Sequence, residues 1–284
     1  MSLRDLKFEH VVRDANVNSD AWKRHFETAP LPQKKYVIFF TARSGSSWLT
    51  SVLSAENRFG RPEEFLNPGF IRDVAEAVNC KDPEFFLPSL LKKVQSPNGV
   101  FGIEVREIDV VLMGKELFFK NFDSKTTFFN LWRENIVAQA VSLYRAVETG
   151  HFHSGDGKEE NAAPDYYADG LEKWVVDIAA QENANVLMLQ REGRAFINLC
   201  YEHTVKSREA VLALFADALN ISRPQGHTAP AALPLKKIGD DWNDEVEKAY
   251  RKERGSVVAK IEEARLIKKL IIAQSQGRVF QPDF

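Results

Sequence analysis

Residues 36–50, with the sequence YVIFFTARSGSSWLT, constrain the fold more strongly than any other stretch of this chain. The run from Tyr36 to Thr41 is mostly apolar and β-prone, which is typical of a strand buried on both faces of a parallel sheet. It leads directly into Arg-Ser-Gly-Ser-Ser, after which a helix is predicted from about Ser47 to Ala55. A buried strand that passes through a short Gly/Ser loop into a helix is the first unit of an α/β fold.

Strands and helices continue to alternate along the chain. Two more strands are predicted at 99–105 and 126–132, and a fourth at 196–202. The predicted helices cover 71–95 with breaks at Pro83 and Pro88, 107–120, a stretch from Ile136 to its stop at Gly150, 168–192, 207–219 with Ser207 as N-cap, and a charged segment near the C-terminus. This alternation predicts a three-layer α/β fold, in which helices flank a parallel sheet.

The length of 284 residues is sufficient for one large domain with its own core. We expect a single domain at 36–284, preceded by a polar N-terminal extension at 1–35 that holds a short helix around Trp22. Two helical insertions are expected, at about 66–97 and 150–195.

Charge and hydropathy argue against several classes of function. The formal net charge is −2, so no overall basic field favours nucleic acid or a membrane surface. No stretch approaches the ~18 consecutive apolar residues of a membrane span, and the charged N-terminus lacks the apolar core of a signal peptide. The two cysteines, Cys80 and Cys200, have no metal-type spacing, which argues for a reducing compartment and against a structural zinc site. A cytoplasmic protein is therefore expected.

The loop after the first strand carries the groups that an oxyanion needs. The start of a helix presents unpaired N–H groups and a positive dipole end, and Gly45 lets the backbone wrap closely around a ligand. Ser44, Ser46 and Ser47 add hydroxyl donors, and Arg43 adds a planar, permanently charged fork. The loop predicts a phosphate or sulfate site. On its own it fits a serine-capped helix with a surface arginine equally well.

A second arginine separates the nucleotide-binding alternatives. The motif G-x-x-x-x-G-K-[ST] is absent, and the strand at 126–132 ends in Arg133 rather than in the aspartate that would hold magnesium. Ser142 follows nine residues later on the predicted helix, where it can converge with Arg133 on one phosphate. The pattern favours an anion held without a metal and disfavours a small-molecule kinase.

With these motifs the sequence resembles the sulfotransferases that use 3′-phosphoadenosine 5′-phosphosulfate (PAPS). More narrowly, it is similar to the bacterial carbohydrate sulfotransferases of the trehalose 2-sulfotransferase type, whose relatives are often labelled LPS sulfotransferases. The matching segments are ARSGSSWL (42–49), RPEEF (61–65), PNGVFG (97–102), WRENIVAQAVSLYRAVETG (132–150) and NLCYEHTV (198–205). The resemblance implies a P-loop-NTPase-like fold, sulfuryl transfer from PAPS to a hydroxyl of a carbohydrate or related small molecule, no metal, and a homodimer with Trp174 near the interface.

The resemblance also implies roles for individual residues. Glu64 corresponds to the general base, and Arg43 would meet the charge that develops on the leaving phosphate. Adjacent Glu63 is expected to be solvated. The implied nucleotide-binding residues are Arg43, Ser44, Gly45, Ser46, Ser47 and Trp48 for the phosphosulfate, Arg133 and Ser142 for the 3′-phosphate, Tyr201 for the adenine, and Lys236 and Lys237 in a loop that closes over the nucleotide.

Two departures from the family pattern leave an alternative open. Arg61 stands where relatives carry an acidic residue, which suggests a different, anionic acceptor. Glu104 stands where relatives often carry lysine, and Arg106 on the same strand face is the candidate for the missing positive charge. A nucleotide-binding protein of this fold without turnover is the alternative. His151 and His153 lack a third ligand at a telling spacing, so substrate contact is favoured over metal binding.

Overall fold

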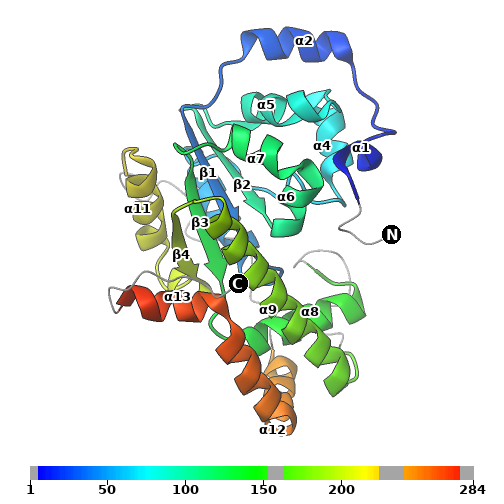
Figure 1. Cartoon of the computed structure of the whole chain (residues 1–284), viewed down its shortest axis with the longest axis vertical. Coiled ribbons are helices and arrows are strands. Elements are labelled where there is room, and N and C mark those ends of the chain that lie inside the picture. The colour runs from blue at the N-terminus through cyan, green and yellow to red at the C-terminus, as the bar shows by residue number, and fades with distance from the viewer. Residues whose placement is uncertain (1–5, 153–162, 224–239, 276–284) are drawn as a thin grey trace.

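A computed structural model describes residues 6–152, 163–223 and 240–275. Its centre is a four-stranded sheet in the order β2-β1-β3-β4, in which every neighbouring pair is parallel (Figure 1). The strands are β1 (Lys34–Phe39), β2 (Val100–Val105), β3 (Thr127–Trp132) and β4 (Phe196–Cys200). The predicted α/β class, with a parallel sheet flanked by helices, is confirmed.

Helices precede, follow and connect the strands. They are α1 (Phe8–Val11), α2 (Ser19–Thr28), α3 (Ser46–Ala55), α4 (Ile71–Val78), α5 (Pro83–Val94), α6 (Glu107–Met113), α7 (Lys115–Asn121), α8 (Ile136–Thr149), α9 (Ala168–Arg191), α10 (Tyr201–Thr204), α11 (Arg208–Leu219), α12 (Asp241–Ala264) and α13 (Leu266–Ser275). None of the described helices is long and apolar enough to cross a membrane.

The two faces of the sheet bury different clusters because successive strand residues point to opposite sides. Val37 and Phe39 of β1 pack into a cluster with α4, α5, α6, α7 and part of α9. Tyr36 and Ile38 pack into a second cluster with α3 and α11. Figure 1 shows α11 on one side of the sheet and α5, α6 and α7 on the other. The buried run of β1 therefore lies in the middle of three layers, as its apolar sequence predicts.

The N-terminal 35 residues contribute to the first of these clusters. Phe8, Val12 and Ala15 are buried there, and the Trp22 indole N–H donates to Ser89 of α5 at 2.8 Å. The short helix expected around Trp22 is α2. The domain boundaries given above stay a prediction.

The helix ends follow the capping residues in the sequence. Gly150 ends α8 in the left-handed region, and the Ser207 side chain caps α11 by accepting from the N–H of Ala210 at 3.1 Å. The segment expected at 168–192 is one helix, α9, which ends at Arg191.

The prediction of a break at Pro88 is wrong, because α5 continues through it. Pro88 removes one hydrogen bond in the middle of the helix. Burial compensates for that loss: Phe86, Leu87, Leu90 and Leu91 are all almost completely buried.

Three further boundaries also differ from the prediction. Gly114, with φ of 93°, divides the helix expected at 107–120 into α6 and α7. The strand expected to reach residue 202 ends at Cys200, and Tyr201 begins the short helix α10. The C-terminal segment forms two helices, α12 and α13, and α12 has a kink at Arg254.

Candidate active site

The carboxyl edge of the sheet gathers the segments that follow all four strands. Because the strands are parallel, β1, β2, β3 and β4 all end at this edge, which is where ligands bind in open α/β sheets. Arg43 follows β1, Arg106 follows β2, Arg133 follows β3, and Tyr201 follows β4. Residues far apart in the sequence therefore meet at one edge.

Arg43, Arg133, Ser142 and Tyr201 form what we call the cation cluster. The Arg43 Nε donates to Ser142 Oγ at 2.9 Å, and its Nη1 donates to the Phe152 carbonyl at 2.6 Å. Burial, and then the nearby charge of Arg133, lower the pKa of Arg43. Two guanidinium groups held this close, in a half-buried position, attract an anion because an anion relieves their mutual repulsion.

Arg133 is oriented by the residues that begin α10. Its guanidinium carbon lies 4.9 Å from the centre of the Tyr201 ring, and its Nε lies 3.4 Å from Glu202 Oε1. Glu202 also accepts from the backbone N–H of Glu134 at 2.9 Å and of Asn135 at 3.2 Å. Burial acts to raise the pKa of Glu202, but these N–H bonds outweigh it and hold the pKa below its usual value. The turn between β3 and α8 is thus fixed to the end of β4.

Gly45 is the residue that lets Tyr201 approach the loop after β1. Its φ is 92°, and a Cβ at this position would lie 2.1 Å from Cδ2 of Tyr201. Gly45 is also the N-cap of α3 and has no side chain to cap that helix. The first N–H groups of α3 therefore keep the donor capacity that an anion uses.

The serines of this loop have three different environments. Ser44 is fully buried, and in the described part of the chain its hydroxyl has no hydrogen-bond partner. Ser46 is buried and faces Glu104, whereas Ser47 is exposed. Trp48 packs against the cluster between the sheet and α11. The buried Ser44 hydroxyl can therefore still form a hydrogen bond, as expected of a loop that binds a ligand.

Gln139 is a loop-positioning residue that the sequence analysis missed. It is fully buried on α8, and its amide donates to Thr41 Oγ1 at 2.9 Å and to the Ala42 carbonyl at 2.7 Å. It therefore holds the junction between β1 and the loop. Its position on the buried stripe of α8, next to apolar neighbours, was the available signal.

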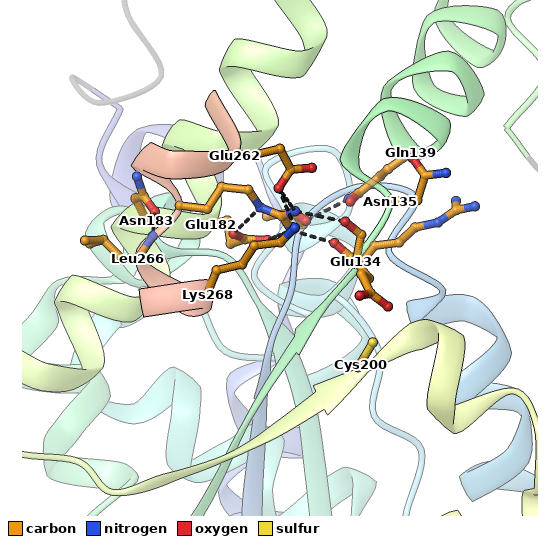
Figure 2. A network of polar contacts seen from close by, with 12 residues as sticks. Glu134, Asn135, Gln139, Glu182, Asn183, Cys200, Glu262, Leu266 and Lys268 are labelled. Carbon is orange, nitrogen blue, oxygen red and sulfur yellow. Dashed lines mark hydrogen bonds and ion pairs between the residues drawn. The ribbon is translucent and has the colours of Figure 1, made fainter. Parts of the chain in front are cut away.

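Arg265 is the second residue that was missed, and it anchors the backbone at Arg133. Figure 2 shows the polar network to which it belongs, with Glu134, Glu182 and Glu262 labelled. It lies between α12 and α13 and is fully buried. Its guanidinium donates to the carbonyls of Arg133 at 2.5 Å and of Glu134 at 3.0 Å. The same group binds both carboxylate oxygens of Glu182 on α9, at 2.9 and 2.8 Å. The C-terminal helices therefore support the cation cluster from behind.

Glu63, Glu64 and Glu104 form what we call the acid cluster, beside β2. Glu63 pairs with the exposed Arg61 at 2.6 Å, in line with its expected position at the solvent side. Glu64 is half-buried, and its Oε2 accepts from the Asn67 amide at 2.7 Å. The charge of Glu64 raises the pKa of the buried Glu104, so the two carboxylates lie near each other. Glu104 contacts Thr50 of α3. The predicted base therefore lies on the same side as the first turns of α3.

Glu104 itself is almost completely buried and accompanied by hydroxyl groups. Its Oε1 lies 2.6 Å from Thr50 Oγ1, and burial raises its pKa to about 8. Arg106 does not supply the positive charge that this position lacks. Its guanidinium donates to Asp109 at 2.9 and 2.7 Å, so its charge is paired with that acid. At the start of α6 the Asp109 carboxylate also accepts from the backbone N–H of Arg106 at 2.8 Å.

Several predicted residues lie outside these clusters or outside the described residues. Lys236, Lys237 and His153 lie outside the described residues. His151 is buried, and neither ring nitrogen has a partner among the residues that the structure describes. Trp174 packs against the cluster of α8, α9 and α12 within its own chain.

Glu134, Cys200 and His203 bring one ligand atom each within 4.8 Å of one another. Burial, and then the hydrogen bond to Glu202, raise the pKa of Cys200 to about 11. Without a metal the sulfur is therefore a thiol at neutral pH, and a metal would have to displace its proton.

Comparison with known proteins agrees with this geometry. The profile of the Stf0 sulphotransferase family matches residues 35–253. The trehalose 2-sulfotransferase of Mycobacterium tuberculosis (strain ATCC 35801 / TMC 107 / Erdman) is 22% identical, over 78% of this chain and 95% of that protein. The chain therefore belongs to the Stf0 sulphotransferase family, as its motifs predict.

Proposed function

We propose that this sulfotransferase moves a sulfuryl group from PAPS to a hydroxyl of a carbohydrate or related small-molecule acceptor. The observation that carries the proposal is the cation cluster. Arg43 and Arg133 lie close enough for one to lower the pKa of the other, and Ser142 already bonds to Arg43. Negative charge bound at either arginine would offset the repulsion between them.

The residues present fit the two anionic ends of PAPS. Arg133 and Ser142 would bind the 3′-phosphate, and Tyr201 would contact the adenine. Arg43, the Ser44 hydroxyl and the uncapped N-terminus of α3 would hold the 5′-phosphosulfate. Lys236 and Lys237 would close over the nucleotide. No metal is part of the proposal.

The proposed chemistry needs one base and one site for developing negative charge. The acceptor oxygen forms a bond to sulfur, the bond between sulfur and the 5′-phosphate oxygen breaks, and the acceptor proton passes to Glu64. The Asn67 amide, which donates to Glu64 at 2.7 Å, would orient that carboxylate. Arg43 and the N–H groups of α3 would stabilise the charge on the leaving phosphate.

The proposed class of acceptor is based on the name of the relative and on the presence of Arg61 near Glu64. The name trehalose 2-sulfotransferase gives a sugar as the acceptor of that relative. Arg61, at the solvent side of the Glu64 segment, favours an acceptor that carries a negative charge in addition to hydroxyl groups. The homodimer and the cytoplasmic location expected above remain predictions.

A thermal-shift titration tests the donor nucleotide. Wild type is titrated with 3′-phosphoadenosine 5′-phosphate, with ADP and with Mg-ATP, and the same is done with Arg133→Ala. A ligand that binds only the folded protein raises its melting temperature. We expect a large shift with the 3′-phosphorylated nucleotide alone, and its loss in Arg133→Ala. Arg223→Ala, which removes an exposed arginine paired with Asp217, is the matched control and should leave the shift unchanged.

Equal shifts with ADP, or no shift at all, would overturn the proposed donor. A turnover assay with PAPS and a panel of neutral and anionic sugars then separates a transferase from a nucleotide-binding protein without turnover. Dependence of the reaction on ATP and magnesium would instead indicate a kinase.

A further inference from the structure

The hydroxyl of Thr50 lies between two oxygen atoms, and its single proton can serve only one of them. Thr50 Oγ1 is 2.7 Å from the carbonyl oxygen of Pro62 and 2.6 Å from Oε1 of Glu104. A carbonyl oxygen can only accept a hydrogen bond. Both contacts are therefore full hydrogen bonds only if Glu104 carries a proton and donates it to Thr50 Oγ1, while Thr50 donates to Pro62.

The surroundings of Glu104 favour the same protonation state. It is 3% exposed, and the groups that face it are Ser46 and Thr50 from α3, Tyr36 from β1, and Glu63 and Glu64 from the neighbouring segment. All of these are hydroxyls or acids, and within the described residues Glu104 forms no ion pair. Burial above all raises the pKa of Glu104 to about 8; the Thr50 and Ser46 hydroxyls oppose the shift, and the charges of Glu64 and Glu63 add to it.

Glu104 also holds the backbone that leads to Glu64 at two points. Its N–H donates to the Glu63 carbonyl at 3.1 Å, and its side chain reaches the Pro62 carbonyl through Thr50. The two residues that precede Glu64 are thus both tied to Glu104. Loss of the shared proton would remove one of these two links and place a second negative charge beside Glu64.

We propose that Glu104 is a neutral carboxylic acid in the working enzyme and that it is a positioning residue for Glu64. The proposal deepens the proposed function, because it takes Glu64 as the general base. A neutral group at this position does not repel the sulfate or phosphate of a donor at the start of α3, whereas a carboxylate would.

The protonation state is tested without turnover by infrared difference spectroscopy of wild type minus Glu104→Gln. The carbonyl band of a protonated carboxyl group should be present in wild type at pH 6 and should disappear with a midpoint near pH 8. Absence of that band at pH 6 overturns the proposal, whatever the enzyme's activity.

Thermal stability gives a second readout that is independent of turnover. The folded protein keeps this proton up to about pH 8, whereas the unfolded chain releases it near the ordinary value of 4.5. The folded state therefore binds more protons in this window, and its stability falls as pH rises. The melting temperature of wild type should fall relative to that of Glu104→Gln between about pH 4.5 and 8. A constant difference contradicts the proposal.

The positioning role is tested by kinetics. Glu104→Gln keeps a donor to Thr50 and should retain kcat within about threefold, while the loss of activity near pH 8 disappears. Thr50→Val keeps the shape, breaks the link to Pro62 and should lower kcat by up to about 10²-fold. Affinity for 3′-phosphoadenosine 5′-phosphate should be unchanged in both variants, and Thr50→Ser should restore kcat.

Two kinetic results would overturn the positioning role: full kcat in Thr50→Val, or an unchanged alkaline loss of activity in Glu104→Gln. Failure of the proposed base gives a different result. In that case Glu64→Gln keeps its activity, while the infrared band of Glu104 is still present.

Discussion

The two ends of the sheet's carboxyl edge differ in how they manage charge. The cation cluster beside β3 and β4 is half-buried, and its arginines keep their charge and bond to carbonyl, hydroxyl and carboxylate oxygens. The acid cluster beside β2 includes Glu104, whose pKa burial raises to about 8. In the proposed function, anion binding and proton transfer would therefore lie beside different strands, and the base would stay apart from Arg43 and Arg133. The two tasks should then be separable by mutation.

The largest effect is expected from removing the proposed base alone. Glu64→Gln should lower kcat by about 10²–10⁴-fold, because no base then takes the proton from the hydroxyl of the sugar. Binding of 3′-phosphoadenosine 5′-phosphate, measured by calorimetry, should stay as in wild type. Glu63→Gln is the matched control and should retain turnover, since Glu63 pairs with Arg61 at the surface. Equal losses in both variants would contradict the assignment of the base.

A smaller effect is expected from disturbing the cation side alone. Gly45→Ala would place a Cβ 2.1 Å from the Tyr201 ring, so the ring must move. We expect nucleotide affinity to fall by about tenfold or more, because Tyr201 lies against Arg133. Backbone strain at positive φ adds about 1–3 kcal/mol of destabilisation.

Gly193→Ala separates these two contributions. Gly193 has a φ of 61°, and nothing lies within 4 Å of the added Cβ. This variant should show the strain in chemical denaturation and leave nucleotide affinity unchanged. If Gly193→Ala weakens nucleotide binding as much as Gly45→Ala does, contact between Gly45 and Tyr201 is not the cause.

The smallest effect is expected at the rim of the acid cluster. Arg61→Ala removes a surface ion pair, whose contribution to stability is below about 1 kcal/mol. Nucleotide affinity and kcat should change little. If the acceptor is anionic, KM for the acceptor should rise for charged sugars and stay constant for neutral ones. A uniform change across both kinds would remove the argument for an anionic acceptor.

Local patterns in the sequence were sufficient for most of the fold. The apolar run of β1, the glycine after α8 and the serine before α11 each act through neighbours close in sequence, so their structural effects could be predicted. The continuation of α5 through Pro88 could not be predicted, because the packing of α5 against distant residues outweighs the local preference of proline.

The candidate site divides in the same way. The strand-end positions of Arg43 and Arg133 follow from strand prediction alone. Ser142 was paired with Arg133 from the sequence, whereas in the structure it accepts a hydrogen bond from Arg43. The neutral state that we propose for Glu104 depends on burial and on Thr50, 54 residues away in sequence. Arg106 was the sequence candidate for the positive charge missing at this position, and in the structure its guanidinium is paired with Asp109, three residues further on.

The anchoring of Arg133 by Arg265 sets an order on the maturation of this enzyme during synthesis. The carbonyls that Arg265 binds belong to Glu134 and Arg133, which precede it by 131 and 132 positions in the chain. Arg265 lies beyond residue 253, where the family match ends. When the sheet and α8 have left the ribosome, the turn at Arg133 still lacks its anchor, and Glu182 has no cation. A buried carboxylate without its partner is costly, so we expect the final packing of α9 to be favoured only once Arg265 has been synthesised. Nucleotide binding at Arg133, as proposed above, would therefore be fully supported only after Arg265 has been synthesised.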